Sequence, residues 1–537
     1  MTHQRNTRQV IKKWWSVRML KSAPLFTEKE TPETNHLANN LSDRMSQEII
    51  FVLVGPVGSG VSTTAEKIRS ILQSQFKYTV PEIIRMSEFI ANDANKVSIT
   101  VAERDKLDRY ITTMQDAGNK LREKFGANYL AARAVEKIVN IREKNSGYSE
   151  SAGERIIQPK RIAYIIDSIK NIEEYKLLKQ VYGDILVLFG VFAPDQLREK
   201  RLSSNGAASS ETKNIIDRDQ ADIPTFGQMT RKTFIESDFY ICNDQKLEEL
   251  DRKVRRLLDI IFDVNIHTPT RAESAMYEAE AAAMNSACMS RQVGASIVSD
   301  SGELIAIGWN DVPKFGGGLY NEGDQMTMKE GKIIDSDNRC FKYKGNICHN
   351  EIKRRGIIEK VVEKMISGKL FKKEIGKSDV IRILSGTEID SIIEYSRSIH
   401  AEMEAILSVA REGKNSLLKS TMYTTTYPCH NCARHIVAAG IKEVVYIQPY
   451  QKSLAIELHG DAISELQDDT GRVIFRQYDG VAPRNFIRAF KSVRDRKSNG
   501  RLARPNSETA YPIFRTQLDS FSKYEDKVVA DLLAKVV

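Results

Sequence analysis

Cysteine is scarce in this sequence, which has six cysteines among 537 residues. So few thiols do not make a disulfide framework; they indicate a reducing compartment and leave metal binding or catalysis open. Long apolar runs are missing too. The longest, 185–193, is about half as long as a membrane span, so we expect no transmembrane helix and no membrane partner. The first residues lack the apolar core of a secretory signal, and we expect none.

Charge of one sign is not in strong excess either. The chain has 80 Lys and Arg against 71 Asp and Glu, which gives a net charge of +9. This mildly basic balance fits anionic partners, either nucleotides or nucleic acid, without choosing between them. Hydrophobic residues make up 41% and charged residues 28%, as in ordinary globular proteins and unlike disordered tails. The length predicts more than one domain.

Residues 1–47 are expected to form a basic N-terminal arm. Six Lys and Arg side chains precede the first acidic residue, Glu28, and Trp14 and Trp15 lie among them. One interpretation is a segment that contacts nucleic acid or another subunit. The alternatives are a partly ordered helix that packs on its own protein and a mitochondrial transit peptide.

An α/β fold is predicted for residues 48–265. Helical patterns, the first of them at 62–75, alternate with short apolar runs at 48–54, 161–166, 184–189 and 239–242. Apolar runs separated by helices are typical of a parallel sheet that is covered on both faces. The polar stretch 201–222 is expected to be a mobile loop.

A second domain is expected at 271–500, with an insertion at 312–395 and a C-terminal extension at 501–537. The segment 265–270 carries the break between the two domains. The elements predicted around the insertion are a helix at 271–291, strands at 293–298 and 304–307, a helix at 400–412, a strand at 421–425, a helix at 429–440 and a strand at 443–447. This alternation again predicts an α/β domain.

Two short motifs in the second domain carry a metal-site pattern. His400 and Glu402 form H-x-E, and Cys429 and Cys432 form P-C-x-x-C, which begins its cysteine pair 29 residues after His400 (429 − 400). This combination is the signature of zinc-dependent base deaminases. One imidazole and two thiolates can hold Zn²⁺ and leave a fourth position for water, whose pKa then falls from about 15.7 toward roughly 7. Glu402 is not a ligand here; its carboxylate moves protons from water to the ring nitrogen and the departing amine.

The C-x-x-C motif alone would also fit a redox pair or half of a zinc ribbon. The matched H-x-E upstream disfavours the redox pair, and Cys340 and Cys348 are too far apart to supply the second C-x-x-C of a ribbon. Cys340, Cys348 and His349 could form a second zinc site instead. The alternative is that they are loop or core thiols near a surface histidine.

The sequence around these motifs resembles the deoxycytidylate deaminase family. The segments that carry the resemblance are 396–402, 427–433, 291–295 and 307–310. It implies a cytidine-deaminase-like α/β/α domain in which Asn310 binds the sugar of the nucleotide. Most plain members of the family have a shorter connection than the insertion here. Tyr450 and Lys452 follow the last strands of the site, so we predict that they contact the substrate through its base or its phosphate.

A glycine-rich loop follows the first apolar run. It fits the P-loop pattern G-x-x-x-x-G-K-[ST], except that Val61 occupies the position of the lysine that supplies charge at the β- and γ-phosphates. Backbone N–H groups and the helix start still make an anion cradle, so we expect a nucleoside triphosphate with Mg²⁺ there, with Asp167 at the metal. The alternative is a degenerate domain kept as a scaffold. The predicted binding residues are Gly55, Gly58, Ser59, Gly60, Val61, Ser62 and Thr63.

The segments 192–201 and 237–244 resemble the lid start and the last strand of nucleoside-monophosphate kinases. This resemblance implies a P-loop kinase-like parallel sheet domain. Such a domain ahead of a deoxycytidylate-type deaminase resembles the bacterial anti-phage deoxycytidine-nucleotide deaminases. That family implies deamination of dCTP and dCMP to dUTP and dUMP in the bacterial cytoplasm, as an antiviral defence that depletes these nucleotides. It also implies an inhibitory small RNA and a homo-oligomer.

Three alternative functions stay open. The first is a housekeeping dCMP deaminase with a regulatory nucleotide-binding domain. The second is a polynucleotide cytidine deaminase, which the basic arm favours. The third is a nucleotide-binding regulatory module with a dormant deaminase, which the intact set of His400, Glu402, Cys429 and Cys432 disfavours.

Overall fold

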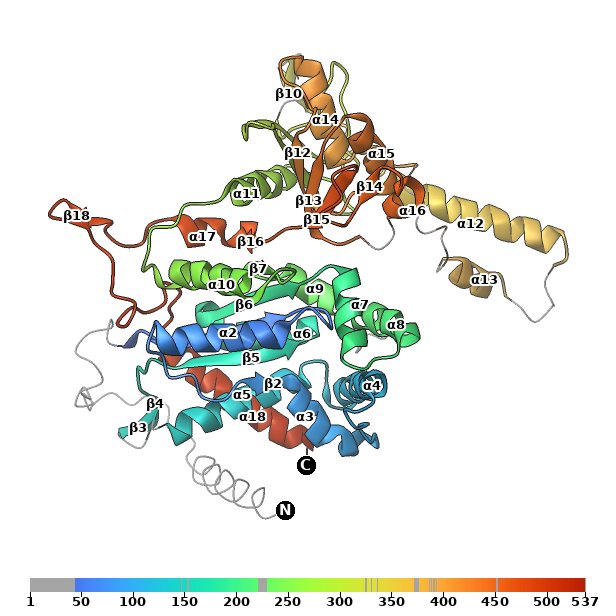
Figure 1. Ribbon diagram of the computed structural model, residues 1–537. Coiled ribbons are helices and arrows are strands. Elements are labelled where there is room, and N and C mark those ends of the chain that lie inside the picture. Colours follow the sequence, from blue (N-terminus) through green and yellow to red (C-terminus); the bar gives the residue numbers. More distant parts are fainter. Residues whose placement is uncertain are drawn as a thin grey trace.

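Two six-stranded sheets, one above the other in Figure 1, organise the chain. The computed structural model describes residues 44–536 apart from 146, 152–153, 221–228, 324–325, 330, 336, 371–375, 386, 388, 390–391, 393 and 451–452. The expected basic arm therefore lies outside the described residues except for 44–47, and Lys452 lies outside them too. Within the described residues, every helix is too short or too polar to cross a bilayer.

The first sheet has the strand order β16-β7-β6-β1-β5-β2. Its main strands are the apolar runs expected from the sequence, namely β1 (Ile49–Val54), β5 (Ala163–Ile169), β6 (Leu186–Phe192) and β7 (Phe239–Cys242), with the short β2 (Ile84–Arg85) at the edge. β1 pairs in parallel with β5 and β6, and β6 pairs in parallel with β7. The predicted α/β fold with a parallel sheet is confirmed.

Helices cover both faces of this sheet (Figure 1). One face carries α2 (Val61–Ser74) and α10 (Leu247–Phe262), and the other carries α5 (Tyr129–Lys144), α6 (Ile172–Tyr182) and α18 (Asp519–Val536). Because side chains of a strand alternate, the odd-numbered residues of β1 belong to the core under α2 and α10, and the even-numbered ones to the opposite core. This explains why all six residues of β1 are apolar and buried.

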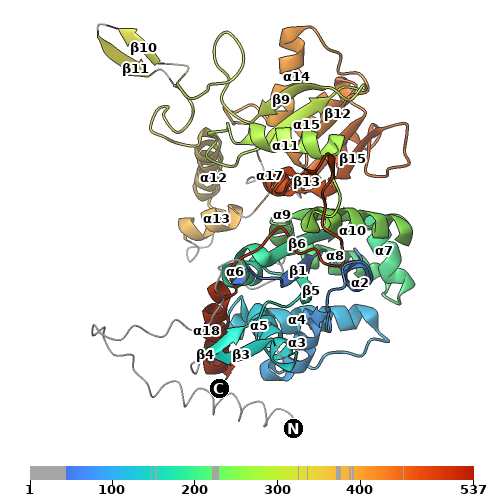
Figure 2. The same ribbon diagram turned by 90° about the vertical axis from the view of Figure 1, so that its left-hand side faces the viewer.

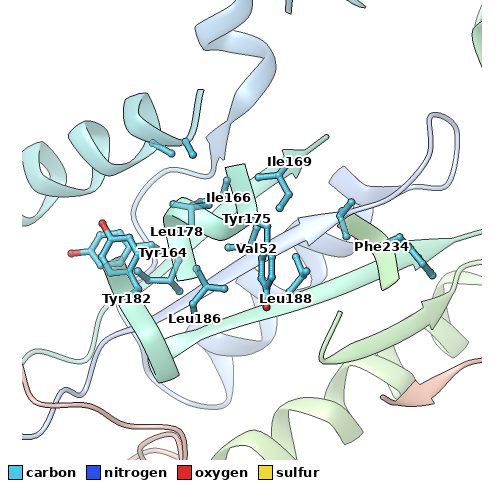
Figure 3. Packing of buried hydrophobic residues seen from close by; sticks show 14 of the residues in the cluster. Val52, Tyr164, Ile166, Ile169, Tyr175, Leu178, Tyr182, Leu186, Leu188 and Phe234 are labelled. Carbon is cyan, nitrogen blue, oxygen red and sulfur yellow. The ribbon is translucent and has the colours of Figure 1, made fainter. Parts of the chain in front are cut away.

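Figure 3 shows the second of these cores, where three strands meet one helix. Val52, Ile166 and Leu188 come from the adjacent strands β1, β5 and β6, and Tyr175 and Leu178 come from α6. α6 begins with a capping box, in which Asn171 accepts a hydrogen bond from the backbone N–H group of Glu173. The start of this helix is therefore specified by local sequence, and its position is specified by the apolar face.

Further elements lie around the sheet. They are α3 (Met86–Asp93), α4 (Leu107–Phe125), the hairpin of β3 (Tyr148–Ser151) and β4 (Glu154–Ile157), α7 (Asp195–Ser204), α8 (Ser209–Gln220) and α9 (Thr230–Ile235). The mobile loop expected at 201–222 is wrong, because α7 and α8 occupy most of it. Leu202, Ala207 and Ile216 form a small core there, so tertiary packing outweighs the polar composition.

The second sheet has the order β14-β15-β13-β12-β8-β9. Its strands are β8 (Gly294–Val298), β9 (Leu304–Trp309), β12 (Thr421–Thr426), β13 (Glu443–Gln448), β14 (Ile463–Ser464) and β15 (Val473–Gln477). The helices that accompany it are α11 (Arg271–Ala283), α14 (Ala401–Glu412), α15 (His430–Ala438) and α16 (Ala455–His459). The strands predicted at 293–298 and 304–307 are present as β8 and β9, which pair antiparallel.

The insertion at 312–395 forms separate elements beside the second sheet. They are the hairpin of β10 (Met326–Lys329) and β11 (Lys332–Asp335), then α12 (His349–Ser367) and α13 (Lys377–Leu384). α12 and α13 extend away from the sheet at the right of Figure 1. Ile358, Val362 and Val380 form a small core between these two helices.

After the second sheet, the chain returns to the first one. β16 (Gly480–Val481) pairs antiparallel with β7, and it is followed by α17 (Phe486–Phe490), the hairpin of β17 (Lys497–Ser498) and β18 (Arg501–Leu502), and α18. Fully buried Arg142 of α5 donates to Glu48 at 2.9 and 2.8 Å and to Glu525 of α18 at 2.7 Å. Residues 480–536 thus complete the first sheet and its cover, while the domain limits given above remain predictions.

Candidate functional site

Three side chains able to bind metal converge at the starts of two helices. His400 is the N-cap residue of α14, Cys429 is the N-cap residue of α15, and Cys432 lies in the first turn of α15. His400 Nδ1 is 3.3 Å from Cys429 Sγ and 3.4 Å from Cys432 Sγ. Within the described part of the chain, this is the only group of three or more His, Cys, Asp or Glu that could hold a metal ion. One imidazole and two buried thiols are a donor set that fits Zn²⁺.

The strand β9 fixes the position of the helix that carries His400. A Cβ atom at Gly308 would lie 2.4 Å from the carbonyl oxygen of Ala401, so only glycine allows α14 to lie so close to β9. On the other side of the site, the Tyr427 hydroxyl donates to Glu465 Oε1 at 3.0 Å. This contact holds the segment that leads from β12 into Cys429.

Glu402 lies in the first turn of α14 and is 4% exposed. Burial raises the pKa of its carboxyl above the ordinary value, although the adjacent His400 imidazole lowers it in part. A hydrogen bond from Cys432 lowers the pKa of the Cys429 thiol to about 4, which favours the thiolate needed by a metal. A carboxylate with a raised pKa is a stronger proton acceptor than an ordinary one, which suits a group that must take up protons and release them again.

A cavity of about 760 Å³ opens beside these side chains. His400, Glu402 and Cys429 line it, as do Asn310 and Tyr450, two of the predicted substrate contacts. The third, Lys452, lies outside the described residues. The volume is within the range of roughly 300–1,000 Å³ that is typical of small-molecule sites.

Asn310 uses its amide to hold the backbone that borders the cavity. Its Oδ1 accepts from the Val293 N–H group at 2.7 Å, and its Nδ2 donates to the Arg291 carbonyl oxygen at 2.9 Å. The guanidinium group of Arg291 in turn lies 5.4 Å from the ring centroid of Tyr450. The predicted contact of Asn310 with a sugar stays a prediction; what the structure provides is a fixed amide at the cavity wall.

Cys340, Cys348 and His349 line the same cavity together with Cys288. They do not form a metal-binding cluster of the kind found at His400, as far as the described residues go. A second zinc site at these residues therefore stays a prediction.

The glycine-rich loop lies at the carboxyl end of β1 and leads into α2. Gly60 has φ 85°, and a Cβ atom there would lie 2.0 Å from Asn243 Nδ2, which donates to the Ser59 carbonyl oxygen at 2.9 Å. Ser62 Oγ donates to Asp167 Oδ2 at 2.7 Å, so the acid expected at a metal ion does lie beside the loop. All the predicted loop residues except buried Ser59 line a cavity of about 900 Å³.

Two further residues bind this loop and were missed by sequence reasoning. Lys170 Nζ donates to the Gly55 carbonyl oxygen at 2.6 Å and pairs with Asp219 at 3.0 Å, and Asp219 accepts from the Val57 N–H group at 2.7 Å. Asp219 lies in the stretch that was expected to be a loop. The one available signal for Lys170 is its place directly after β5, at the sheet edge where parallel sheets bind ligands.

Residues 269–448 match the family model of the cytidine and deoxycytidylate deaminase zinc-binding region. This segment is therefore similar to the zinc-binding region of that family. It contains all three clustered side chains and Glu402. A deoxycytidylate deaminase of Enterobacteria phage T2 is 29% identical over 185 residues, which are 34% of this chain and 82% of the phage protein.

Other relatives and solved structures each match about two fifths of the chain. A UPF0200 protein of Thermococcus onnurineus is 21% identical over 215 residues, which are 40% of this chain and 98% of that protein. Among solved structures, a dCMP deaminase from the cyanophage S-TIM5 has 18% identity and a TM-score of 0.21, over 40% of this chain and all of that one. A shikimate kinase from Acinetobacter baumannii has 11% identity and a TM-score of 0.24, over 41% of this chain and 96% of that one.

Proposed function

We propose that the chain catalyses the zinc-dependent hydrolytic deamination of free deoxycytidine nucleotides. The reaction converts dCMP and dCTP to dUMP and dUTP and releases ammonia. The observation that carries the proposal is the convergence of His400, Cys429 and Cys432 beside the buried carboxyl of Glu402 at one cavity. The similarity of the chain to a phage deoxycytidylate deaminase supports the deoxycytidine nucleotide as substrate.

The residues divide the chemistry between them. His400, Cys429 and Cys432 would hold Zn²⁺, which when bound polarises water for attack on the base. Glu402 would take one proton from the water and deliver it to the ring nitrogen N3, and then move the second proton, from the new hydroxyl group on C4, to the departing amine. A C4–O bond forms and the C4–N bond breaks, so that water and the cytosine base give uracil and ammonia. Because Glu402 is shielded from solvent, these protons pass between the substrate and one carboxyl group.

The shape of the site favours a free nucleotide over a polynucleotide as substrate. The cavity of about 760 Å³ has the size of a site for one small molecule. Residues of α9, from the first domain, and of α12, from the insertion, both line this cavity.

We propose a binding role for the P-loop domain. A nucleoside triphosphate with Mg²⁺ would bind at the loop, with Ser62 and Asp167 at the metal. Val61 is packed into the core and supplies no charge to the β- and γ-phosphates, which favours binding and regulation over phosphoryl transfer. From the resemblance of this fused architecture to the bacterial anti-phage deoxycytidine-nucleotide deaminases, we also propose that the enzyme is antiviral, cytoplasmic and homo-oligomeric, depletes these nucleotides and is inhibited by a small RNA.

The test is a substrate panel with the purified full-length chain. We expect uracil from dCMP and dCTP, and little from CTP or single-stranded DNA, when the products are measured by chromatography. Glu402→Ala should keep its zinc, measured by elemental analysis, and lose activity by roughly 10²–10⁴-fold, because the ligands stay while the proton carrier is gone. Glu412→Ala, at the exposed end of the same helix, is the matched control. Wild-type rates in Glu402→Ala would disprove the mechanism.

A further inference from the structure

The deaminase cavity has a wall that belongs to the P-loop domain. Helix α9 (Thr230–Ile235) lies between β6 and β13, and so between the two sheets (Figures 1 and 2). Arg231, Lys232 and Ile235 of this helix line the cavity that also contains His400 and Glu402. The metal-binding side chains and the α9 side chains that line this cavity therefore come from segments far apart in the sequence.

The other side of α9 is fixed in the first domain. Thr230, Thr233 and Phe234 are at most 4% exposed, and the ring of Phe234 lies 5.1 Å from that of Tyr240 in β7. The N–H group of Met229 donates to the Lys170 carbonyl oxygen at 2.8 Å. Lys170 is the residue whose ammonium group holds the P-loop at Gly55. α9 is thus a rigid support, anchored next to the P-loop, that presents two cations to the other domain's cavity.

The cavity carries more positive than negative charge. The charged Arg, Lys, Asp and Glu side chains that line it are Arg231, Lys232, Arg291, Arg354, Arg397, Glu351 and Glu402. Glu351 already pairs with Arg354 and Arg355, and Glu402 lies next to His400. Arg397 stacks 3.9 Å from the ring centroid of Tyr343. Among the described residues Lys232 has no ion-pair partner, and it is exposed.

The Arg231 side chain is less accessible to solvent than the Lys232 side chain. It is half-buried, and burial lowers the pKa of its guanidinium group. A cation that has lost part of its hydration gains more from a bound anion than a fully solvated one. Phosphate oxygens are suitable anions, because guanidinium and ammonium groups both bind them through charge-assisted hydrogen bonds.

We infer that Arg231 and Lys232 of the P-loop domain bind the outer phosphates of a nucleoside triphosphate whose base lies at His400 and Glu402. The inference rests on the proposed function, since it assumes that a deoxycytidine nucleotide occupies this cavity. The base must lie beside His400 and Glu402 for the chemistry to occur, and Arg231 and Lys232 line the same cavity, where the phosphate chain can contact them. A monophosphate is too short to gain as much from α9 as a triphosphate. The P-loop domain thereby determines the preference of the deaminase for dCTP over dCMP.

The experiment compares kcat/KM for dCTP, dCDP and dCMP in the full-length chain. Loss of a charge-assisted contact should lower kcat/KM for dCTP by roughly tenfold to hundredfold in Lys232→Ala and in Arg231→Ala. The decrease in kcat/KM should come from a higher KM. It should be smaller for dCDP than for dCTP, and smallest for dCMP. Lys232→Arg keeps a cation and should restore most of the dCTP preference. Lys213→Ala, an exposed lysine of α8 outside the cavity lining, is the matched control.

The outcomes separate this inference from the proposed function. Equal losses for dCTP and dCMP, or no loss in either variant, would overturn the role of α9 while leaving the deaminase intact. A wild-type chain that deaminates dCMP and not dCTP would also overturn it. A wild-type chain that forms no uracil from any nucleotide would overturn the proposed function and this inference with it. Because Lys232 is exposed, its replacement leaves the fold intact and the test remains decisive.

Discussion

The carboxylate of Glu273 joins three segments of the chain, and its removal should destabilise their junction. It is 1% exposed and lies in the first turn of α11. It accepts hydrogen bonds from Arg256 of α10 at 2.8 and 2.7 Å. It also accepts from the N–H groups of Thr270 at 2.7 Å and of Val481 in β16 at 3.0 Å. One side chain thus caps the helix that enters the second domain and also holds the returning chain to the first one.

The expected cost of Glu273→Ala follows from the groups that it leaves unpaired. Removing one partner of a buried ion pair costs about 3–5 kcal/mol, and a buried N–H group without an acceptor costs roughly 1–3 kcal/mol. The Arg256 side chain is 20% exposed, so water can reach its guanidinium group in the variant. We therefore expect Glu273→Ala to lower the free energy of unfolding by about 3 kcal/mol, the lower end of the range for a broken buried ion pair. Urea unfolding followed by circular dichroism would measure this change. Glu278→Ala on the same helix is the control and should change the free energy of unfolding by less than about 0.5 kcal/mol.

The effect of Glu273 should also depend on pH. Burial alone would raise the pKa of its carboxyl, but the hydrogen bonds from Arg256 and from the backbone hold this pKa below its ordinary value. A carboxyl with a lowered pKa in the folded state stabilises the fold fully above its unfolded pKa, which is about 4.3, and loses this contribution as pH falls through the folded value. The difference in stability between wild type and Glu273→Gln should therefore be largest near pH 7 and shrink below about pH 4. A difference that grows on acidification, or Glu273→Ala with wild-type stability, would refute the reasoning.

Two further substitutions test the metal site and the P-loop separately. Cys429→Ala should lose both zinc and deamination, because two protein ligands do not hold a catalytic zinc ion, and elemental analysis with a dCMP assay would check this. Retained zinc would contradict the ligand set. Gly60→Asp should abolish binding of a nucleoside triphosphate in calorimetry, since its Cβ atom would lie 2.0 Å from Asn243 Nδ2 and its φ of 85° is strained for aspartate. The dCMP turnover of this variant should change little, and its full loss would show that the loop supports the deaminase fold directly.

Four of the six strands in each sheet could be predicted because their signals are local, whereas β2, β14, β15 and β16 were not. β1, β6 and β7 are short apolar runs, and the structure places their limits within three residues of the prediction. The helices α7 and α8 could not be predicted, because their sequence is polar and their stability comes from contacts elsewhere. Asp219, for example, is 2% exposed through its bonds to Val57 and Lys170. Such contacts exist only after the chain has folded.

The same distinction applies to the candidate site. His400, Glu402 and Cys429 could be predicted, because each motif places its side chains at the first turn of one helix and the spacing of H-x-E and P-C-x-x-C is specific. Arg231 and Lys232 could not, since they join the same cavity only through the packing of two sheets. Nothing in the sequence around α9 distinguishes these two cations from others on helix surfaces.

The return of the chain to the first sheet determines how the two proposed functions can be separated by experiment. If the chain were cut at 265–270, the P-loop part would lose β16 and α18. Phe521 of α18 is fully buried against this sheet, and Arg142 binds Glu525 of the same helix. A fragment without α18 would expose this core. It would also leave the buried Arg142 guanidinium group with Glu48 as its carboxylate partner and without Glu525, and losing one partner of a buried ion pair costs several kcal/mol of folding free energy. Loss of function in such a fragment would then report unfolding rather than the role of a domain. Substitutions at α9 and at the P-loop in the full-length chain are therefore the way to learn what the first domain contributes to the deaminase.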